Sequence, residues 1–373
     1  TSTIIWVEIW VEIKIRYKLA DFSQTRRPLS PPVPCLPVFV NLKVIWEMSV
    51  HYNKEGKITP RKLLIPAIAV LILAVAMVLG TFAPRTVLAD GMPELYFIDA
   101  HSQLPGGFAP SKIIPLMDKA GVWRTILSAR NDRSPKDVAN YAAKHPDRIT
   151  AAVRSKGKSF NKNKPKFEKL INLQLKQPIF KALGEVILYH AQKGNKAPEI
   201  NVSLHSPQAR MLLDVALERK WPFIAHYELR ASGPAKSKIL DSFKATARAN
   251  PDHPFLLIHM AQLNVDEVKR LIAAHGNVYF LTSHSNPIRD FSMRQLWTNL
   301  FDGERLLPRW TEVFLENPNR FVLAFDNVWP ENWDYQYLGQ AALWRKALAK
   351  LPPGAAHAIG HGNAERLWNL TPR

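Results

Sequence analysis

Short apolar runs alternate with helical patterns along most of the chain, and this alternation most constrains the fold. Eight runs have the length and the β-branched or aromatic content of buried strands. They lie near residues 95–100, 123–128, 149–154, 182–187, 222–226, 254–259, 277–282 and 320–326. Between them, segments such as those at Ser134 and Asn264 begin with capping residues and continue with apolar spacing of three and four. Such repeated units predict one α/β domain over residues 90–373, a closed (β/α)8 TIM barrel.

The first 89 residues carry a targeting pattern instead of the pattern of a packed core. After Met48, a basic stretch precedes residues 63–82, which hold no charge, and small residues follow at Val87 and Ala89. We expect residues 48–89 to be a signal peptide cleaved after Ala89. An uncleaved N-terminal membrane anchor is the alternative, because the run is long enough to cross a bilayer. Residues 1–47 are expected to be a disordered, non-native upstream extension.

Either kind of leader places the barrel outside the cytoplasm, in the periplasm or secreted. The only cysteine, Cys35, lies upstream of the barrel, which excludes disulfides and thiolate chemistry from residues 90–373. Without the 11 Lys/Arg and 5 Asp/Glu of residues 1–89, the net charge falls from +19 to +13. This charge favours a small anionic substrate or an anionic envelope surface. We expect no nucleic-acid partner, because the aromatic residues do not interleave with basic ones.

Polar residues end several of the apolar runs, where the carboxyl ends of barrel strands would meet. They are His101 and Gln103 on the first strand, Glu185 on the fourth, His226 and His259 on the fifth and sixth, and Asp326 on the eighth. Active sites of such barrels lie at that end. Each residue alone would be an ordinary hydrogen-bonded polar side chain, but their convergence indicates a metal-dependent hydrolase.

The alternation of side chains along a strand also predicts which way these residues point. Asp99 should share a face with His101, and Leu257 should share one with His259. One face of each strand would thus lead polar groups to the barrel mouth.

At this point the chain resembles the amidohydrolase superfamily, in its amidohydrolase-related branch of metal-dependent hydrolases. The resemblance covers about residues 95–370. It rests on Phe-Ile-Asp-Ala-His at 97–101, the Gly-Glu of strand four, the two later histidines, the run ending at Asp326 and Gly-Asn-Ala-Glu-Arg-Leu at 362–367. The family has His-x-His on the first strand, whereas this chain has His101-Ser102-Gln103. An amide oxygen binds metal more weakly than imidazole binds zinc, so the departure leaves a weakened site, a single-metal site or none.

The resemblance implies one divalent metal, zinc first, with manganese or iron as alternatives. It implies His101, Gln103, Glu185, His226 and Asp326 as the metal-site candidates, and His259 as a ligand of metal or substrate. Glu185 ligates or bridges the metal in this interpretation, or pairs with a basic neighbour in the barrel. Asp326 would be the general base that takes a proton from the attacking water.

Substrate contacts are expected from the long, cation-rich loops 155–167, 189–206 and 283–301. Arg154 ends strand three, where its guanidinium is placed to clamp an anion. Tyr189 and His190 follow strand four, His284 follows strand seven, and Trp329 lies just beyond Asp326 as an apolar wall. Each of these is alternatively a packing or solvated residue.

Two functions from different classes follow. The first is an exported hydrolase that cleaves an ester, lactone or amide, or performs the related decarboxylation. The alternative is a catalytically degenerate barrel that binds a ligand in the cell envelope, which Gln103 favours. The sequence contains no phosphate-binding loop, nucleophile elbow or dinucleotide fingerprint. It is silent on the identity of the substrate and on the oligomeric state.

Overall fold

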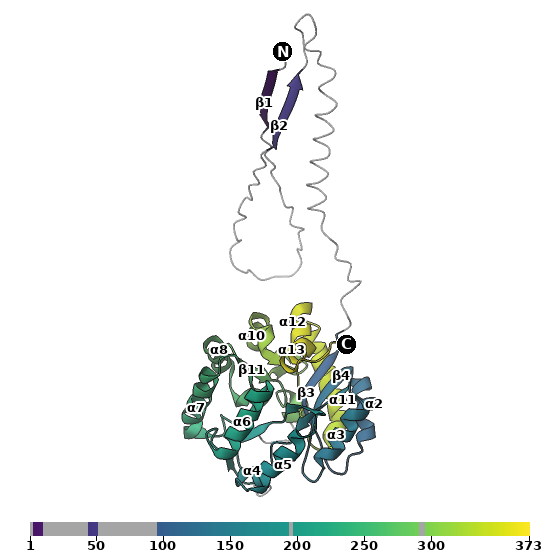
Figure 1. Cartoon of the computed structure of the whole chain (residues 1–373), viewed down its shortest axis with the longest axis vertical. Helices are drawn as coiled ribbons and strands as arrows, with labels where there is room; N and C mark the ends of the chain where they lie inside the picture. The colour runs from purple at the N-terminus through teal and green to yellow at the C-terminus, as the bar shows by residue number, and fades with distance from the viewer. Residues whose placement is uncertain (1–2, 10–43, 51–94, 194–196, 291–294) are drawn as a thin grey trace, which may run out of the picture. The chain divides into compact units, whose positions relative to one another are not determined.

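The computed structural model describes residues 3–9, 44–50, 95–193, 197–290 and 295–373 (Figure 1). Residues 1–92 and 93–373 are two separate compact units. In the first unit, β1 (Thr3–Ile9) pairs antiparallel with β2 (Val44–Val50). The extension and the leader expected at 1–47 and 48–89 otherwise lie outside the described residues and stay predictions. No helix within the described ranges is long and apolar enough to span a membrane.

The second unit is built on parallel strands that follow one another around a ring (Figure 1). One run of paired strands is β3, β4, β5 and β6, and the other is β7, β9, β10, β11 and β14. Only Gly184 and Glu185 separate β6 from β7, so these two form one barrel position. The bounds are β3 Phe97–Leu104, β4 Val122–Ala129, β5 Ile149–Val153, β6 Phe180–Leu183, β7 Val186–His190, β9 Phe223–Tyr227, β10 Phe255–Leu257, β11 Val278–Leu281 and β14 Phe321–Val322.

Backbone hydrogen bonds close the ring between the first strand and the chain that continues β14. The amide of Ala100 donates to the carbonyl of Leu323 at 3.0 Å, and that of Gln103 donates to Asn327 at 2.8 Å. In the other direction, the amide of Asp326 donates to the carbonyl of His101 at 2.8 Å. The predicted (β/α)8 barrel is therefore confirmed for the part of the second unit that the structure describes.

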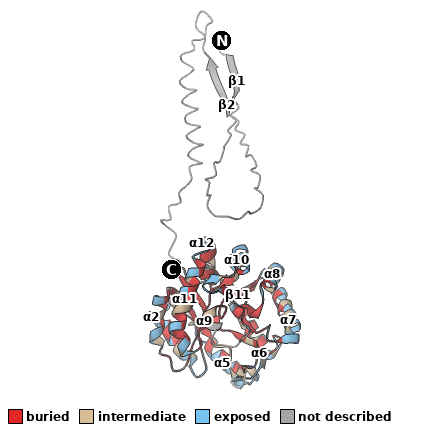
Figure 2. Cartoon of the chain, turned by 180° about the vertical axis from the view of Figure 1, so that it is seen from behind, coloured by how far each residue is buried: buried red, intermediate tan, exposed pale blue. Residues whose placement is uncertain are grey.

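Helices cover the outside of the ring, with their exposed faces outward and their buried faces against the strands (Figure 2). Their bounds are α2 Ile113–Ala120, α3 Pro135–Lys144, α4 Lys158–Asn161, α5 Lys166–Leu175, α6 Pro207–Arg219, α7 Lys236–Ala249, α8 Val265–Ala274, α9 Pro287–Asp290, α10 Pro308–Glu316, α11 Tyr335–Leu348, α12 Pro353–His357 and α13 Asn363–Trp368. In the described part of the second unit, three short strands lie outside the ring: β8 Ile200–Asn201, β12 Phe301–Asp302 and β13 Arg305–Leu306.

The predicted capping residues start the helices that the sequence pattern placed after them. Ser134 accepts a hydrogen bond from the amide of Lys136 at the start of α3. Asn264 and Glu267 form a reciprocal capping box at the start of α8. Side-chain oxygens at these positions satisfy amides that the first turn of a helix leaves without a partner.

The buried apolar residues form two layers. The inner layer fills the barrel and includes Ile98, Ala100, Leu256 and Val322. The larger outer layer lies between the strands and the helices. A residue's membership of one layer or the other shows on which side of the barrel wall its side chain lies.

Candidate metal centre

A bulge in β3 turns His101 and Gln103 toward the inside of the barrel. The pairing of β3 with β4 shifts register between Asp99 and Ser102. Ala100 and His101 lie within this shift; Ala100 packs in the inner layer, and His101 Nε2 lies 3.3 Å from Gln103 Nε2. An extra residue in one strand lets two successive side chains face the same way. Asp99 therefore does not share a face with His101, contrary to the prediction from simple alternation.

Asp99 instead fastens the first strand to the last. Its carboxylate is fully buried and accepts hydrogen bonds from Ser102 Oγ at 2.5 Å and from the amide of Phe325 at 2.9 Å. Burial raises the pKa of Asp99 to about 7, against the lowering effect of these hydrogen bonds. This acid closes the barrel and takes no part in the cluster of ligands.

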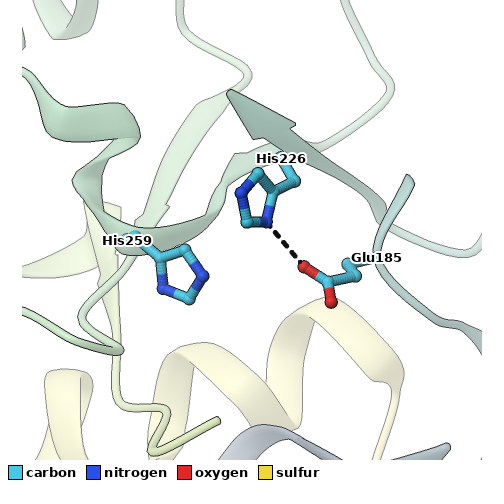
Figure 3. A group of neighbouring side chains, drawn as sticks. All are labelled: Glu185, His226 and His259. Atoms are coloured by element: carbon cyan, nitrogen blue, oxygen red, sulfur yellow. Dashed lines mark hydrogen bonds and ion pairs between the residues drawn. The ribbon is translucent and has the colours of Figure 1, made fainter. Parts of the chain in front are cut away.

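Glu185 lies at the interruption between β6 and β7 and meets His226 of β9 (Figure 3). Its Oε2 lies 2.8 Å from His226 Nδ1, and both residues are buried. A Cβ at Gly184 would lie 2.8 Å from the carbonyl oxygen of Val153, so a glycine is needed where the strand approaches its neighbour. The ring of His259 lies 5.0 Å from that of His226, and the three side chains point into a common space (Figure 3).

Left-handed backbone conformations bring His259 and two further polar residues, His284 and Asp326, to this space. His259, His284 and Asp326 have φ of 56°, 59° and 50°. Such values are rare outside glycine and occur preferentially at functional sites. After Leu257, which packs in the outer layer, the left-handed residues 259–262 redirect the chain. Leu257 and His259 therefore do not share a face, contrary to the prediction.

Asp326 lies within 3.5 Å of three histidines of the cluster. Its Oδ1 lies 3.3 Å from His101 Nε2, and its Oδ2 lies 3.2 Å from His284 Nε2 and 3.5 Å from His259 Nε2. The rings of His259 and His284 stack with centroids 4.1 Å apart. Burial alone would raise the pKa of Asp326, but the hydrogen bond with His101 and the nearby imidazoles hold it well below its usual range.

Within the described ranges, four groups of three side chains have ligand atoms close enough to share a metal ion. They are Glu185, His226 and His259; His101, Glu185 and Asp326; His259, His284 and Asp326; and His190, His226 and Glu228. The trio of His101, His226 and Asp326 is not one of these groups. His101 and Asp326 belong to one group and His226 belongs to another. Glu185 is a member of both groups.

Gln103 presents its amide nitrogen, not its oxygen, to the cluster. Nε2 lies 3.0 Å from Asp326 Oδ1 and 3.2 Å from Glu185 Oε1, while Oε1 accepts a hydrogen bond from Arg130 Nη1 at 3.1 Å. The reversed amide would set its oxygen against two carboxylates and its NH2 group against a guanidinium, so the network fixes the orientation. In this orientation Gln103 does not offer a metal the amide oxygen that the predicted ligand role requires.

Sequence reasoning missed Glu228, which is fully buried behind His226. Its Oε2 accepts a hydrogen bond from the amide of Ala191 at 2.8 Å, and its Oε1 lies 3.4 Å from both His226 Nε2 and Lys193 Nζ. Burial would raise the pKa of Glu228, but the hydrogen bond and charge of His226 and the charge of Lys193 lower it to about 2. Glu228 lies two residues beyond His226, so the alternation of a strand could have revealed it.

His190, a predicted substrate contact, lies beside this carboxylate. Its Nε2 is 3.7 Å from Glu228 Oε1, and its ring centroid is 5.5 Å from that of His226. Burial and the charge of His226 lower the pKa of His190 to about 4, so the ring is neutral at neutral pH.

Cations surround the cluster at the barrel mouth. Lys156 forms an ion pair with Glu185 Oε1, and Arg130 stacks 4.3 Å from the ring of Trp329. Lys156 lies in the loop 155–167 that the sequence predicts to contact substrate, whereas Arg130 is not among the predicted contacts. Arg154 follows β5, but its Nη1 donates to the carbonyl of Asn131 at 2.5 Å and holds a loop.

The remaining predicted substrate contacts, Tyr189 and Trp329, differ in how far they are buried. Tyr189 packs in the outer layer and donates to Glu199 Oε2 at 3.0 Å, so the structure does not bring it to the cluster. Trp329 is 39% exposed and forms part of the mouth. A cavity of about 510 Å³ adjoins Trp297, whose ring lies 4.8 Å from that of His259. None of the histidines or carboxylates of the cluster lines this cavity.

No family model and no curated protein matches this chain. Similar solved structures include 2,6-dihydroxybenzoate decarboxylase from Rhizobium, with 14% identity over 74% of this chain and 99% of that one and a TM-score of 0.46. An uncharacterised TIM-barrel protein from Bordetella bronchiseptica has 17% identity over 74% and 99%, with a TM-score of 0.48. An amidohydrolase from Burkholderia multivorans, also solved with bound zinc, has 13% identity over 74% and 100%, with a TM-score of 0.44. All three likenesses have sequence identities below 20% and TM-scores below 0.5, so the function has to be argued from the side chains of this chain.

Proposed function

We propose that this protein is a metal-dependent hydrolase of the amidohydrolase superfamily that cleaves an ester, lactone or amide bond of a small anionic substrate. The main support is the convergence of buried histidines and carboxylates at one end of the barrel, namely His101, Glu185, His226, His259, His284 and Asp326. Buried ionisable groups cost free energy unless they are paired or bind a ligand. Decarboxylation of a related acid is the alternative reaction at the same site.

The donor set fits zinc, with manganese or iron as alternatives. Glu185, His226 and His259 would hold the ion, because two imidazoles and a carboxylate are ligands of catalytic zinc sites, which keep one position open. Glu228 lies against the other ring nitrogen of His226, as carboxylates that orient metal-binding histidines do. When bound, the metal would polarise a substrate carbonyl and lower the pKa of water to about 7.

Asp326 is placed to act as the general base. The imidazoles of His101 and His284 hold its two oxygens in position, and its low pKa keeps it ionised at neutral pH. It would take a proton from the attacking water and pass it to the leaving group. A positioned base of this kind contributes about 10²–10⁴-fold to the rate.

Arg130 and Lys193 support an anionic substrate. Arg130 lies over Trp329, and Lys193 Nζ lies 5.3 Å from the ring centroid of Trp297. Charged donors next to aromatic faces bind a carboxylate attached to a flat or apolar group. Export, with cleavage after Ala89, belongs to this proposal and rests on the leader pattern.

A second candidate function is a ligand-binding barrel without catalysis. The observation that favours it is the direction of Gln103, whose amide hydrogens fill hydrogen-bonding positions among the ligands. Such a protein would bind the same anionic molecule at the mouth without turning it over.

Metal content and activity separate the two candidates. We would purify the full chain, measure bound zinc, manganese and iron by mass spectrometry, and screen lactones, amides and aromatic carboxylic acids with added zinc and manganese. The hydrolase proposal expects about one tightly held equivalent and turnover that a chelator abolishes and metal restores. Metal-free protein that binds an anion unchanged in the presence of a chelator would contradict it and favour the binding protein.

A further inference from the structure

We propose that the side chains of Gln103 and Lys156 stand in place of a metal ion at one of the possible metal positions of the cluster. This position is the group of His101, Glu185 and Asp326, which we call the inner position. The group of Glu185, His226 and His259 is the outer position, and its use by a metal rests on the proposed function. The inference is that the inner position binds no metal in this chain, whatever happens at the outer one.

The geometry of the Gln103 amide carries this inference. Its Nε2 lies 3.3 Å from His101 Nε2, 3.2 Å from Glu185 Oε1 and 3.0 Å from Asp326 Oδ1. These are the atoms that approach one another in the inner group, where His101 Nε2 lies 3.3 Å from Asp326 Oδ1 and 3.8 Å from Glu185 Oε1. One nitrogen thus contacts every ligand atom that an ion at the inner position would need.

The amide is held firmly in this place. Gln103 is fully buried, and Arg130 Nη1 donates to its Oε1 at 3.1 Å. The backbone amide of Gln103 also donates to the carbonyl of Asn327 across the closure of the barrel. A metal ion at the inner position would have to displace a side chain that is fixed at both ends.

Lys156 adds a second donor on the same side. Its Nζ pairs with Glu185 Oε1, the oxygen that also faces Gln103 Nε2. The other oxygen of Glu185, Oε2, faces His226 Nδ1 at 2.8 Å. The two oxygens of Glu185 are thus divided, one toward protein donors and one toward the outer position. A metal that enters the outer position displaces only the proton between His226 Nδ1 and Glu185 Oε2 and does not displace a side chain.

The test is metal stoichiometry, measured on the full chain by equilibrium dialysis against zinc or manganese and mass spectrometry. The double variant Q103H/K156M replaces the amide with an imidazole and removes the ammonium. We expect it to bind one more equivalent than the wild type. Because an imidazole differs in shape from the buried amide, Q103E is the second variant. It has the shape of glutamine but offers an oxygen in place of the NH2 group, and we expect it to gain one equivalent too. Circular dichroism would check the fold of each.

The matched control is K236M, which removes a lysine paired with Glu267 at the start of α8, a carboxylate outside the four groups. It should leave the stoichiometry unchanged. A folded Q103H/K156M or Q103E that gains no metal, or a wild type that already binds two equivalents, would overturn the inference.

The stoichiometry also separates this inference from the proposed function. One equivalent in the wild type and two in the variants agree with both. None in the wild type and one in the variants would refute the metal-dependent function while upholding the filled inner position.

Discussion

Histidines and carboxylates meet at both ends of this barrel, but they are arranged differently. At the N-terminal ends of the strands, His361 Nε2 lies 3.2 Å from His357 Nδ1, and His361 Nδ1 lies 3.1 Å from Glu365 Oε2. Tyr96, just before β3, stacks on His361 at 3.9 Å and donates to Glu365. At the carboxyl ends, by contrast, each carboxylate faces several histidines from different strands.

The difference lies in how the chain brings the groups together. His357, His361 and Glu365 follow one another at intervals of four along one continuous helical segment, so they contact one another in a row. The ligands at the carboxyl ends come from separate strands, and their atoms point toward shared points. A row of hydrogen bonds stabilises a fold, whereas convergent acceptor atoms bind a cation. Composition alone would not distinguish the two clusters.

The largest effect is expected from D326N. It keeps the shape of the side chain but removes the base, so turnover should fall about 10²–10⁴-fold. Steady-state kinetics on a substrate found in the screen would measure this, with circular dichroism as the check on folding. Full activity in a folded D326N would refute the assignment of Asp326.

Metal affinity should fall when a histidine is removed at the carboxyl ends of the strands, but not when one is removed at the N-terminal ends. We expect H226A to weaken zinc binding by more than about 100-fold, beyond the range typical for residues that only orient a ligand. Competition with a chromophoric chelator would measure the affinity. H361A, which removes a histidine from the opposite end, is the matched control and should keep the affinity of the wild type. An equal loss of zinc affinity in H226A and H361A would contradict the claim that only the cluster at the carboxyl ends binds metal.

A smaller effect is expected from E228Q. The amide keeps the volume of the side chain but loses the charge that faces His226 Nε2, so zinc affinity should fall about 10–100-fold. Chelator competition measures it, and E365Q at the opposite end is the control. An unchanged affinity in E228Q would mean that Glu228 serves only the fold.

The smallest effect is expected at the N-terminal end. H361A loses the stacking with Tyr96 and the hydrogen bond with Glu365, which should lower the free energy of unfolding by about 1–3 kcal/mol. Urea denaturation would show this, with metal content unchanged. If H361A lost metal instead of stability, the N-terminal cluster would need another interpretation.

The sequence predicted the barrel well, because eight apolar runs with capped helices between them follow directly from the periodicity of buried strands and amphipathic helices. It also placed His226 and Glu185 together, because the carboxyl ends of parallel strands meet. These features depend on local pattern and on the topology of the fold, both of which are visible in the sequence.

The directions in which individual side chains point could not be predicted from the sequence. The bulge between Asp99 and Ser102 and the left-handed turn that begins at His259 break the alternation on which the facing of side chains was predicted. Neither involves a glycine, the residue that usually marks such backbone. Arg154 and Lys156 both follow β5, and only tertiary contacts show that Lys156 reaches the cluster and Arg154 does not.

The most direct test of the central claim is anomalous diffraction at the zinc edge from crystals of the full chain grown with zinc. The account predicts one strong peak contacted by His226, His259 and Glu185, and none among His101, Glu185 and Asp326. A barrel without a peak at its mouth, in protein saturated with zinc, would contradict the proposal that this cluster binds a metal.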